Sequence, residues 1–208
     1  MRQTILYISI LAIICSAGLY ASPVYSNTTT DTFDTVFFSV GPYSGLGDQV
    51  LLATGDRFAT DATVQFFNNG SDGTFDAILR LYQIGAPVGA QIGSDFTVTG
   101  ISAPTQSVFN VVFNTGYTAV PDELIFLVYL TNTSAGLDLG LNMFEPPTVG
   151  SSDNAFMVSD AGGFSQLGTN AENVYFQLDA TTPEPGTFAM FGGGLLAAIL
   201  VNRRRLAS

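Results

Sequence analysis

Short apolar segments alternate with turn residues along the middle of the chain, from residue 27 to residue 181. The segments are rich in Val, Thr and Phe, which suit an extended, pleated backbone. No helical periodicity persists between them, so the pattern predicts an all-β fold, a single antiparallel β-sandwich or jelly-roll-like domain. The expected strands cover residues 35–40, 49–54, 62–68, 74–84, 96–99, 108–114, 124–131, 137–143, 155–158 and 174–178.

The turn residues also predict how some strands are arranged. An Asn-Gly pair and an Asp-Gly pair between residues 68 and 73 supply the positive φ angles that tight hairpins need. We therefore expect residues 64–67 and 75–81 to be neighbouring antiparallel strands. Residues 41–48, rich in Gly, Pro and Ser, are expected to form a turn. Residues 123–130 form a dense apolar run and are expected near the centre of the sandwich.

The charges are distributed unevenly along the chain. It contains no Lys, and sixteen of its 17 acidic residues lie between Asp31 and Asp179, where the only basic residues are Arg57 and Arg80. The domain therefore carries a net charge near −14. Such a surface repels phosphate backbones, which excludes nucleic acid as a partner. An acidic balance is typical of a secreted protein that must stay soluble.

Residues with nucleophilic or metal-binding side chains are scarce. The chain has no His, and its only Cys, Cys15, lies in an N-terminal apolar run that we expect to be removed on export. The mature domain then has neither residue type. This excludes Ser-His-Asp and Cys-His catalysis, zinc sites built from imidazole and thiolate, and disulfide bonds.

The N-terminal region, residues 1–26, has the layout of a secretory signal peptide. Arg2 supplies the positive charge, residues 5–17 form a short apolar run, and small residues follow. Cleavage after Ala21 and cleavage after Ser26 both remain open. An N-terminal anchor helix that is never cleaved is the alternative.

The last 27 residues, Thr182–Ser208, fall into three parts. A Pro-Glu-Pro motif comes first, and its prolines hold the backbone extended and accessible. An uncharged apolar segment, residues 186–201, predicts a transmembrane helix slightly short for the hydrocarbon core of about 30 Å. A basic cluster follows as a stop on the cytoplasmic side. The motif is Pro183, Glu184 and Pro185, and the membrane stop is Arg203, Arg204 and Arg205.

This order of motif, apolar helix and basic end resembles the PEP-CTERM sorting signal of Gram-negative bacteria. The resemblance covers residues 182–208. It implies handling by an exosortase, a membrane transpeptidase that cuts near the motif and passes the protein from transient inner-membrane anchoring to the cell surface or extracellular matrix. Such systems typically accompany exopolysaccharide and biofilm genes. A plain tail anchor is the alternative.

One loop has the composition of a calcium site. Asp72 and Asp76 lie on a glycine-rich turn with closely spaced side-chain oxygens, which suit a hard cation. An EF-hand is excluded, because Gly70 and Leu79 stand where that motif requires ligands. A solvated hairpin turn is the alternative, and no other cofactor is expected.

Carboxylates are the remaining candidates for catalysis. A glycoside hydrolase needs two of them about 5 to 10 Å apart across a cleft. The candidates are Glu123, Glu145, Asp153 and Glu172, and their spacing singles out no pair. We therefore expect a non-enzymatic protein, with a carboxylate-dependent hydrolase as the weaker alternative.

Two tyrosines in turn-rich segments, Tyr43 and Tyr117, could stack on sugar rings. They support a second interpretation, a carbohydrate-binding module. The main interpretation is an exported cell-surface or matrix protein, associated with exopolysaccharide or biofilm.

Overall fold

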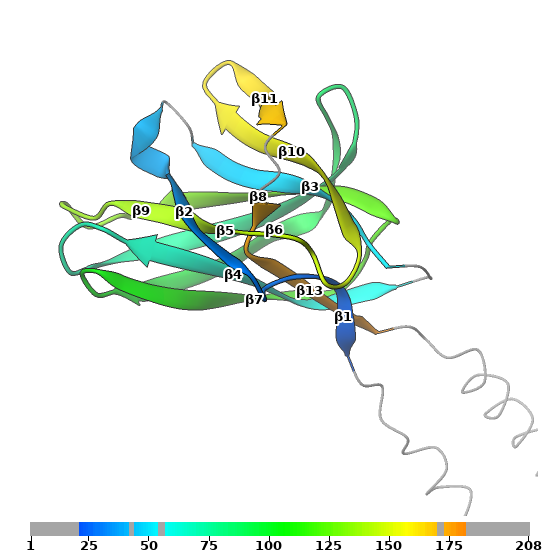
Figure 1. The fold of residues 1–208 in the computed structure, drawn as a ribbon, viewed down its shortest axis with the longest axis horizontal. Coiled ribbons are helices and arrows are strands. Elements are labelled where there is room, and N and C mark those ends of the chain that lie inside the picture. Colours follow the sequence, from blue (N-terminus) through cyan, green and yellow to red (C-terminus); the bar gives the residue numbers. More distant parts are fainter. Residues whose placement is uncertain (1–20, 42–43, 54–56, 170–172, 182–208) are drawn as a thin grey trace, which may run out of the picture. The chain divides into compact units, whose positions relative to one another are not determined.

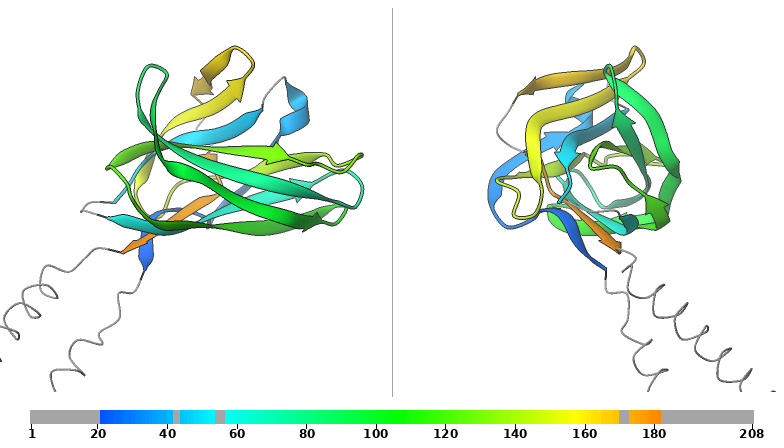
Figure 2. Two further views of the ribbon diagram at one scale, coloured as in Figure 1. Left: turned by 180° about the vertical axis from the view of Figure 1, so that it is seen from behind. Right: turned by 90° about the vertical axis from the view of Figure 1, so that its right-hand side faces the viewer.

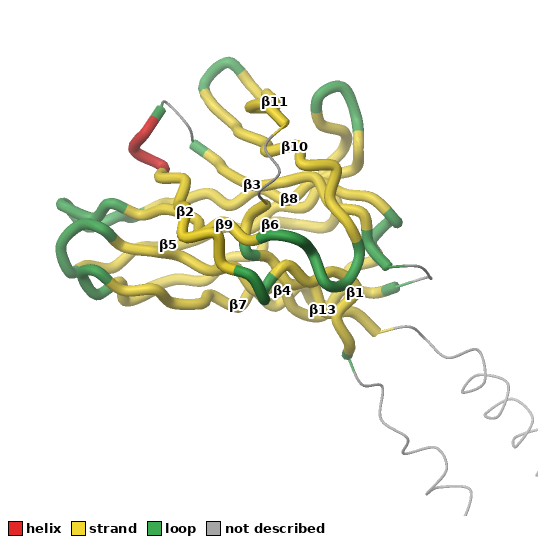
Figure 3. The backbone as a smooth tube through the Cα atoms, viewed as in Figure 1, coloured by secondary structure: helices red, strands yellow, loops and turns green. Residues whose placement is uncertain are grey.

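The computed structural model describes residues 21–41, 44–53, 57–169 and 173–181 (Figure 1). The sorting motif, the expected helix over residues 186–201 and the arginine cluster lie outside these residues. Within them, no helix is long and apolar enough to cross a bilayer. Their one helix is a single 3-10 turn, η1 (Phe38–Val40), drawn in red in Figure 3.

Two antiparallel sheets make up the described part of the chain (Figures 1 and 2), which confirms the all-β prediction. Sheet A has the order β1-β13-β4-β9-β12, with β2 paired to β9 and β7 paired to β4, and sheet B has the order β11-β10-β3-β8-β5-β6. The strands of sheet A are β1 (Ser22–Asn27), β2 (Asp31–Phe37), β4 (Phe58–Asn68), β7 (Ser107–Ala119), β9 (Leu139–Phe144), β12 (Asn173–Val174) and β13 (Phe176–Thr181). The strands of sheet B are β3 (Gly45–Leu51), β5 (Gly73–Ile84), β6 (Val88–Ala103), β8 (Glu123–Thr131), β10 (Ser151–Asp160) and β11 (Gly163–Thr169).

Each expected strand has a counterpart, but several boundaries differ. β6 is far longer than the expected residues 96–99, because glycines that suggest a loop lie within a bulged strand. β3 occupies much of the predicted turn at residues 41–48. β1 and β11 are not predicted at all, since the sequence assigns the first to the signal peptide.

The predicted pairing of residues 64–67 with residues 75–81 is wrong. These residues belong to β4 and β5, which lie in different sheets: β4 pairs with β7, β9 and β13, whereas β5 pairs with β6 and β8. The Gly-rich segment between them crosses from one sheet to the other. Its turn residues have the chemistry of a hairpin, but a buried side chain directs the chain across the sandwich.

That side chain is Asn68, the last residue of β4, which is fully buried. Its Nδ2 donates to the carbonyl oxygens of Ser71 at 2.9 Å and Ala103 at 2.9 Å, so it joins the crossing segment to the end of β6. Its Oδ1 accepts from the backbone N–H of Gly70 at 2.9 Å. The amide thus replaces the backbone hydrogen bonds that a hairpin would have supplied.

We expect Asn68→Ala to lower the free energy of unfolding by roughly 2–4 kcal/mol, because it leaves several buried backbone carbonyl and N–H groups without a hydrogen-bond partner. Asn69→Ala is the matched control, since the neighbouring Asn69 side chain is exposed. Urea unfolding of the two variants measures the difference. A loss of the same size in both variants would contradict the role assigned to Asn68.

The core lies between the two sheets and is dominated by phenylalanines. Phe126 of β8 stacks on Phe176 of β13, with ring centroids 3.8 Å apart and planes 12° apart. Phe66 of β4 faces Phe75 of β5 at 5.4 Å. β8 lies between β3 and β5, and residues 124–128 are buried on both faces, which agrees with the expected central position.

β1 is an integral strand of sheet A. It pairs antiparallel with β13, and Ser22 is opposite Ala180. Tyr25 is fully buried with its ring centroid 5.9 Å from that of Phe176, and Val24 is 8% exposed. The folded unit therefore comprises Ala21–Thr181, and most of β1 lies in the range assigned from the sequence to the signal peptide.

Comparing two forms of the domain tests this boundary. A form that begins at Asn27 is expected to be less stable than one that begins at Ser22 by about 3–5 kcal/mol, the cost of deleting a large core side chain. Denaturant midpoints of residues 22–181 and 27–181 give the measurement. Equal midpoints would show that β1 adds nothing to the folded state.

Candidate functional site

Sheet B curls until strands far apart in its order meet on its outer face. Tyr82 of β5 and Phe164 of β11 are separated by β8, β3 and β10, which would place them roughly 19 Å apart in a flat sheet. Their ring centroids are 5.3 Å apart. Figure 2 shows the β10–β11 and β5–β6 hairpins rising from the same side of the sheet. The outer face is therefore concave.

Apolar side chains fill this concave face and form a second cluster, separate from the core between the sheets. Its buried members come from three strands, with further residues packed against them from β6 and β11. The cluster consists of Tyr82, Ile125, Leu127 and Met157, with Val88, Tyr129 and Phe164 packed against it. It holds the curled sheet together from the outside.

Two glycines of β3 make the curl sterically feasible. A Cβ at Gly45 would lie 2.7 Å from the ring of Tyr129, and a Cβ at Gly47 would lie 1.8 Å from the carbonyl oxygen of Phe126. A side chain at Gly47 would clash with the backbone, and one at Gly45 would displace the ring of Tyr129. These residues, which favour a turn in the sequence, are strand residues that let neighbouring side chains close over β3.

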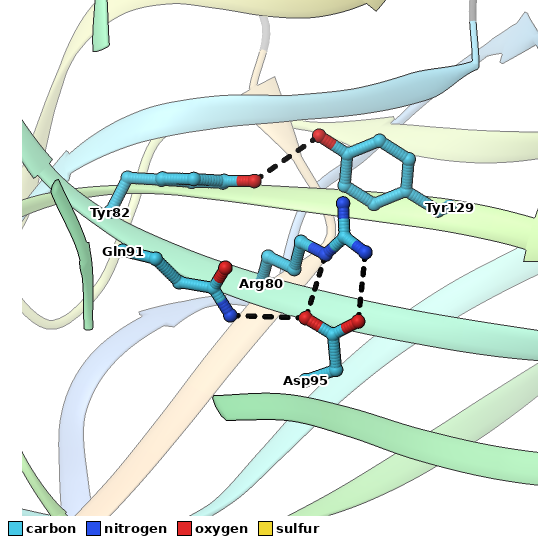
Figure 4. A network of polar contacts seen from close by, with 5 residues as sticks. All are labelled: Arg80, Tyr82, Gln91, Asp95 and Tyr129. Atoms are coloured by element: carbon cyan, nitrogen blue, oxygen red, sulfur yellow. Dashed lines mark hydrogen bonds and ion pairs between the residues drawn. The ribbon is translucent and has the colours of Figure 1, made fainter. Parts of the chain in front are cut away.

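A polar network borders the cluster (Figure 4). Arg80 of β5 donates through Nε and Nη2 to the two oxygens of Asp95 of β6, both at 2.8 Å. Gln91 Nε2 donates to the same carboxylate at 3.0 Å. The guanidinium lies 4.6 Å from the centroid of the Tyr129 ring, whose hydroxyl oxygen is 3.4 Å from that of Tyr82. A bidentate pair fixes both charged groups in one orientation.

The network holds fixed protonation states around neutral pH. The hydrogen bond from Arg80 lowers the pKa of Asp95, and Asp95 in turn raises the pKa of Arg80. Burial, followed by the contact with Tyr129, raises the pKa of Tyr82 to about 12. Asp95 is thus an anion, Arg80 a cation and Tyr82 a neutral phenol at pH 7. These groups offer hydrogen bonds and aromatic surface rather than proton transfer at that pH.

A shallow hollow of about 360 Å³ lies next to Asp95, between β6 and β7. Both strands are sheet edges in the described part of the chain, since β6 pairs with β5 and β7 with β4. Left-handed backbone interrupts each of them, at Gly93 (φ 70°) and at Gly116 (φ 61°). Most of the lining is polar. It consists of Gly93, Ser94, Asp95, Phe96, Thr97, Asn114, Thr115, Gly116 and Thr118.

Tyr117, one of the two tyrosines predicted to contact sugar, lies on the same bulge as the hollow. It is 64% exposed and has φ 60°, a left-handed conformation that is uncommon for a residue with a Cβ. The other predicted tyrosine, Tyr43, lies outside the described residues. The structure therefore shows the surroundings of Tyr117 but not those of Tyr43.

A second hollow is lined by residues of η1, of the end of β8 and of the loop leading to β9. Its residues are Phe38, Ser39, Ser44, Leu130, Thr133, Ser134, Leu137, Asp138 and Leu139. Within it, Ser39 donates to Asp138 at 2.6 Å. This hydrogen bond holds the Asp138 carboxylate against η1.

The calcium candidates have their carboxylates directed to protein groups. Asp72 Oδ1 accepts from the backbone N–H of Thr105 at 2.6 Å. Asp76 accepts from the N–H of Gly100 at 2.7 Å and from Asn132 Nδ2 at 2.6 Å, and these bonds lower its pKa. Within the described residues no group of three or more acidic side chains is placed to hold a metal ion. Calcium binding at these two aspartates stays a prediction.

The acids considered for hydrolysis lie on different elements. Glu123 of β8 accepts from Gln49 Nε2 at 2.8 Å, and Asp153 of β10 accepts from the N–H of Ala155 at 3.1 Å. Glu145 follows β9. Glu172 lies outside the described residues. β3 separates β8 from β10 in the sheet, so Glu123 and Asp153 lie on strands that are not paired with each other.

A further acid, Asp48, is buried in the core. It points inward from β3, is 1% exposed, and accepts from the N–H of Gln49 at 2.8 Å, and the backbone N–H of Val174 also interacts with the carboxylate. Burial raises its pKa well above the usual range. Burial and the nearby Asp48 likewise raise the pKa of Tyr25. The core thus holds a carboxylic acid that resists ionisation.

This shift has a pH signature. The pKa of Asp48 is higher in the folded state than in the unfolded state. Asp48 therefore does not reduce the free energy of unfolding below the unfolded pKa of about 4, but this free energy falls as pH rises from that value through the folded-state pKa. Asp48→Asn is expected to make the free energy of unfolding less dependent on pH and to raise it at neutral pH. Thermal unfolding from pH 4 to pH 9 measures the effect.

Asp76→Asn is the control, since the pKa of Asp76 is lowered and the sign reverses. Its stability should fall below that of the natural chain at neutral pH and approach it at low pH. Parallel profiles for the natural chain and Asp48→Asn would contradict a strained buried acid.

Sequence reasoning missed the Arg80–Asp95 pair. One signal was available, because Arg80 is one of only two basic residues between Asp31 and Asp179. Its partner was hidden, since the expected strand at residues 96–99 leaves Asp95 in a loop.

Comparisons with known proteins identify the tail. Residues 181–205 match the PEP-CTERM protein-sorting motif, which confirms the predicted signal. The chain is thus marked as an exported protein that an exosortase processes at the membrane. No curated protein sequence matches the chain. A solved structure from the infectious bursal disease virus Gt strain shares 13% identity with a TM-score of 0.26, covering 90% of this chain and 51% of that one. A likeness this low carries no argument.

Proposed function

We propose that the chain is a non-enzymatic protein of the cell surface or extracellular matrix, released there by exosortase processing and associated with exopolysaccharide. The observation that carries this proposal is the sorting motif, which matches from residue 181, the last residue of β13. The match thus begins where the last strand of the folded domain ends. A domain attached in this way is a cargo that its tail delivers.

The character of the domain supports a binding or structural role over catalysis. Its most organised polar network, Arg80 with Asp95, holds fixed charges at neutral pH instead of a group poised for proton transfer. The acidic surface favours solubility outside the cell and disfavours anionic partners. A carbohydrate-binding role is the second candidate, favoured by the exposed ring of Tyr117. A carboxylate hydrolase has less support, because the candidate acids lie on separate elements.

Processing of the tail tests the proposal. In cells with an active exosortase, intact-mass analysis of the surface or matrix fraction should find protein that lacks most of Thr182–Ser208. The new C-terminus should lie after Thr181, because cutting earlier would shorten β13, whose Ala180 and Thr181 are buried. Replacing Pro183 and Pro185 with Ala should leave the full tail in place and the protein in the membrane fraction.

An exosortase deletion is the matched control, and it should reproduce the distribution of the double proline variant. Recovery of the complete tail on surface protein from cells with the active enzyme would end the proposal. Equal processing in the deletion strain would assign the cut to another protease.

A further inference from the structure

We propose that the hollow between β6 and β7, together with the ring of Tyr117, binds a neutral, hydroxyl-rich glycan. This inference rests on the proposed extracellular function only for the class of partner the protein would meet. The site itself is argued from three features of the described residues: an exposed ring, an unsatisfied hydroxyl and an immobilised carboxylate.

The first feature is the position of the aromatic ring. Gly116 and Tyr117 are consecutive left-handed residues, with φ values of 61° and 60°. For Tyr117 this conformation costs on the order of 1–2 kcal/mol, and the side chain recovers little of it through packing, since it is 64% exposed. The residues on either side of it, Gly116 and Thr118, line the hollow. An exposed aromatic ring beside them in the chain can cover the apolar face of a pyranose.

The second feature is a polar atom with no protein partner. Thr115 lines the hollow and is 1% exposed, and its Oγ1 makes no hydrogen bond within the described part of the chain. A buried hydroxyl without a partner is costly. The neighbouring Thr118 hydroxyl instead donates to the Thr115 carbonyl at 2.6 Å. A ligand hydroxyl would supply the partner that Thr115 lacks.

The third feature is Asp95, whose carboxylate lines the same hollow. Arg80 and Gln91 hold it in place, and its side chain remains 40% exposed. Oδ1 already accepts from Arg80 Nε and Gln91 Nε2, whereas Oδ2 accepts from Arg80 Nη2 alone and can take one further hydrogen bond from a ligand hydroxyl. A sugar hydroxyl matches this fixed acceptor.

The charges around the hollow decide between classes of ligand. Arg80 already occupies Asp95 in bidentate fashion, which disfavours a metal ion on that carboxylate. Arg80 and Arg57 are the only cations between Asp31 and Asp179, so uronic or sulfated glycans meet net repulsion. Neutral hydroxyls meet one acceptor at Asp95 and further polar groups at Ser94, Thr97 and Asn114. A neutral glycan is therefore the matching ligand.

The test uses the exported protein purified from its producing cells. The probes are neutral hexasaccharides of glucose, mannose, galactose and N-acetylglucosamine, with hexagalacturonate as the anionic comparison, titrated by calorimetry. At least one neutral probe should bind, and more tightly than hexagalacturonate. Tyr117→Asn should weaken that binding at least tenfold, because Asn tolerates the left-handed backbone while removing the ring. Tyr117→Phe should keep affinity within about threefold.

Phe33→Asn is the matched control. Phe33 of β2 is 91% exposed with φ 64°, so it shares the exposure and backbone of Tyr117, but its neighbours in the chain do not line the hollow, whereas those of Tyr117 do. Its replacement should leave glycan affinity unchanged. Thr115→Val should weaken binding severalfold without lowering the unfolding midpoint of the free protein, because it removes a hydroxyl that has no protein partner to lose.

Three outcomes would overturn the proposal. One is no binding of any neutral probe at millimolar concentration. Another is preferential binding of hexagalacturonate. The third is a loss of affinity in Phe33→Asn as large as that in Tyr117→Asn. Each of them leaves the tail-processing result untouched, so a failure of the glycan site is distinguishable from a failure of the proposed delivery.

Discussion

Strand β8 is covered by apolar side chains on both of its faces, and the rest of the domain is arranged around it. Phe126 points inward to Phe176 of the opposite sheet, whereas Leu127 points outward into the cluster that Tyr82 and Met157 share. On β3, Gly45 leaves room for the ring of Tyr129, and Gly47 leaves room for the backbone of β8. This packing places Arg80 against Tyr129 and brings β6 and its Asp95 to the border of the concave face.

Local sequence predicts extended backbone well in this chain, because alternating apolar residues report directly on a half-buried strand. It predicts pairing less well. The turn after β4 has hairpin chemistry, yet the chain crosses to the other sheet because the buried amide of Asn68 satisfies carbonyls from three-dimensional neighbours. Gly45 and Gly47 are ambiguous for a similar reason, since a glycine that permits close packing and one that makes a turn look alike in sequence.

The candidate site shows the same division. Tyr117 can be anticipated, because a tyrosine in a turn-rich segment has few ways to be buried, and the structure leaves it exposed. The hollow beside it cannot, because it depends on two bulges that bring β6 and β7 together only in the folded sandwich. Asp95 joins Arg80 across a strand pair whose irregular register is set by glycine. The sorting motif differs from all of these, since it is read as a peptide and needs no tertiary contact to be recognised.

The pairing of β1 with β13 has a mechanical consequence. Ser22 lies opposite Ala180, so the first and last residues of the folded unit leave it at the same end of one antiparallel ladder. Tension applied between these two ends would act on the terminal hydrogen bonds one pair at a time, as in unzipping, and not on all of them together as in shear. A force applied between one terminus and a distant point of the sandwich would not unzip the β1–β13 pair in this way. The durability of the domain under force therefore depends on which of its ends remains attached.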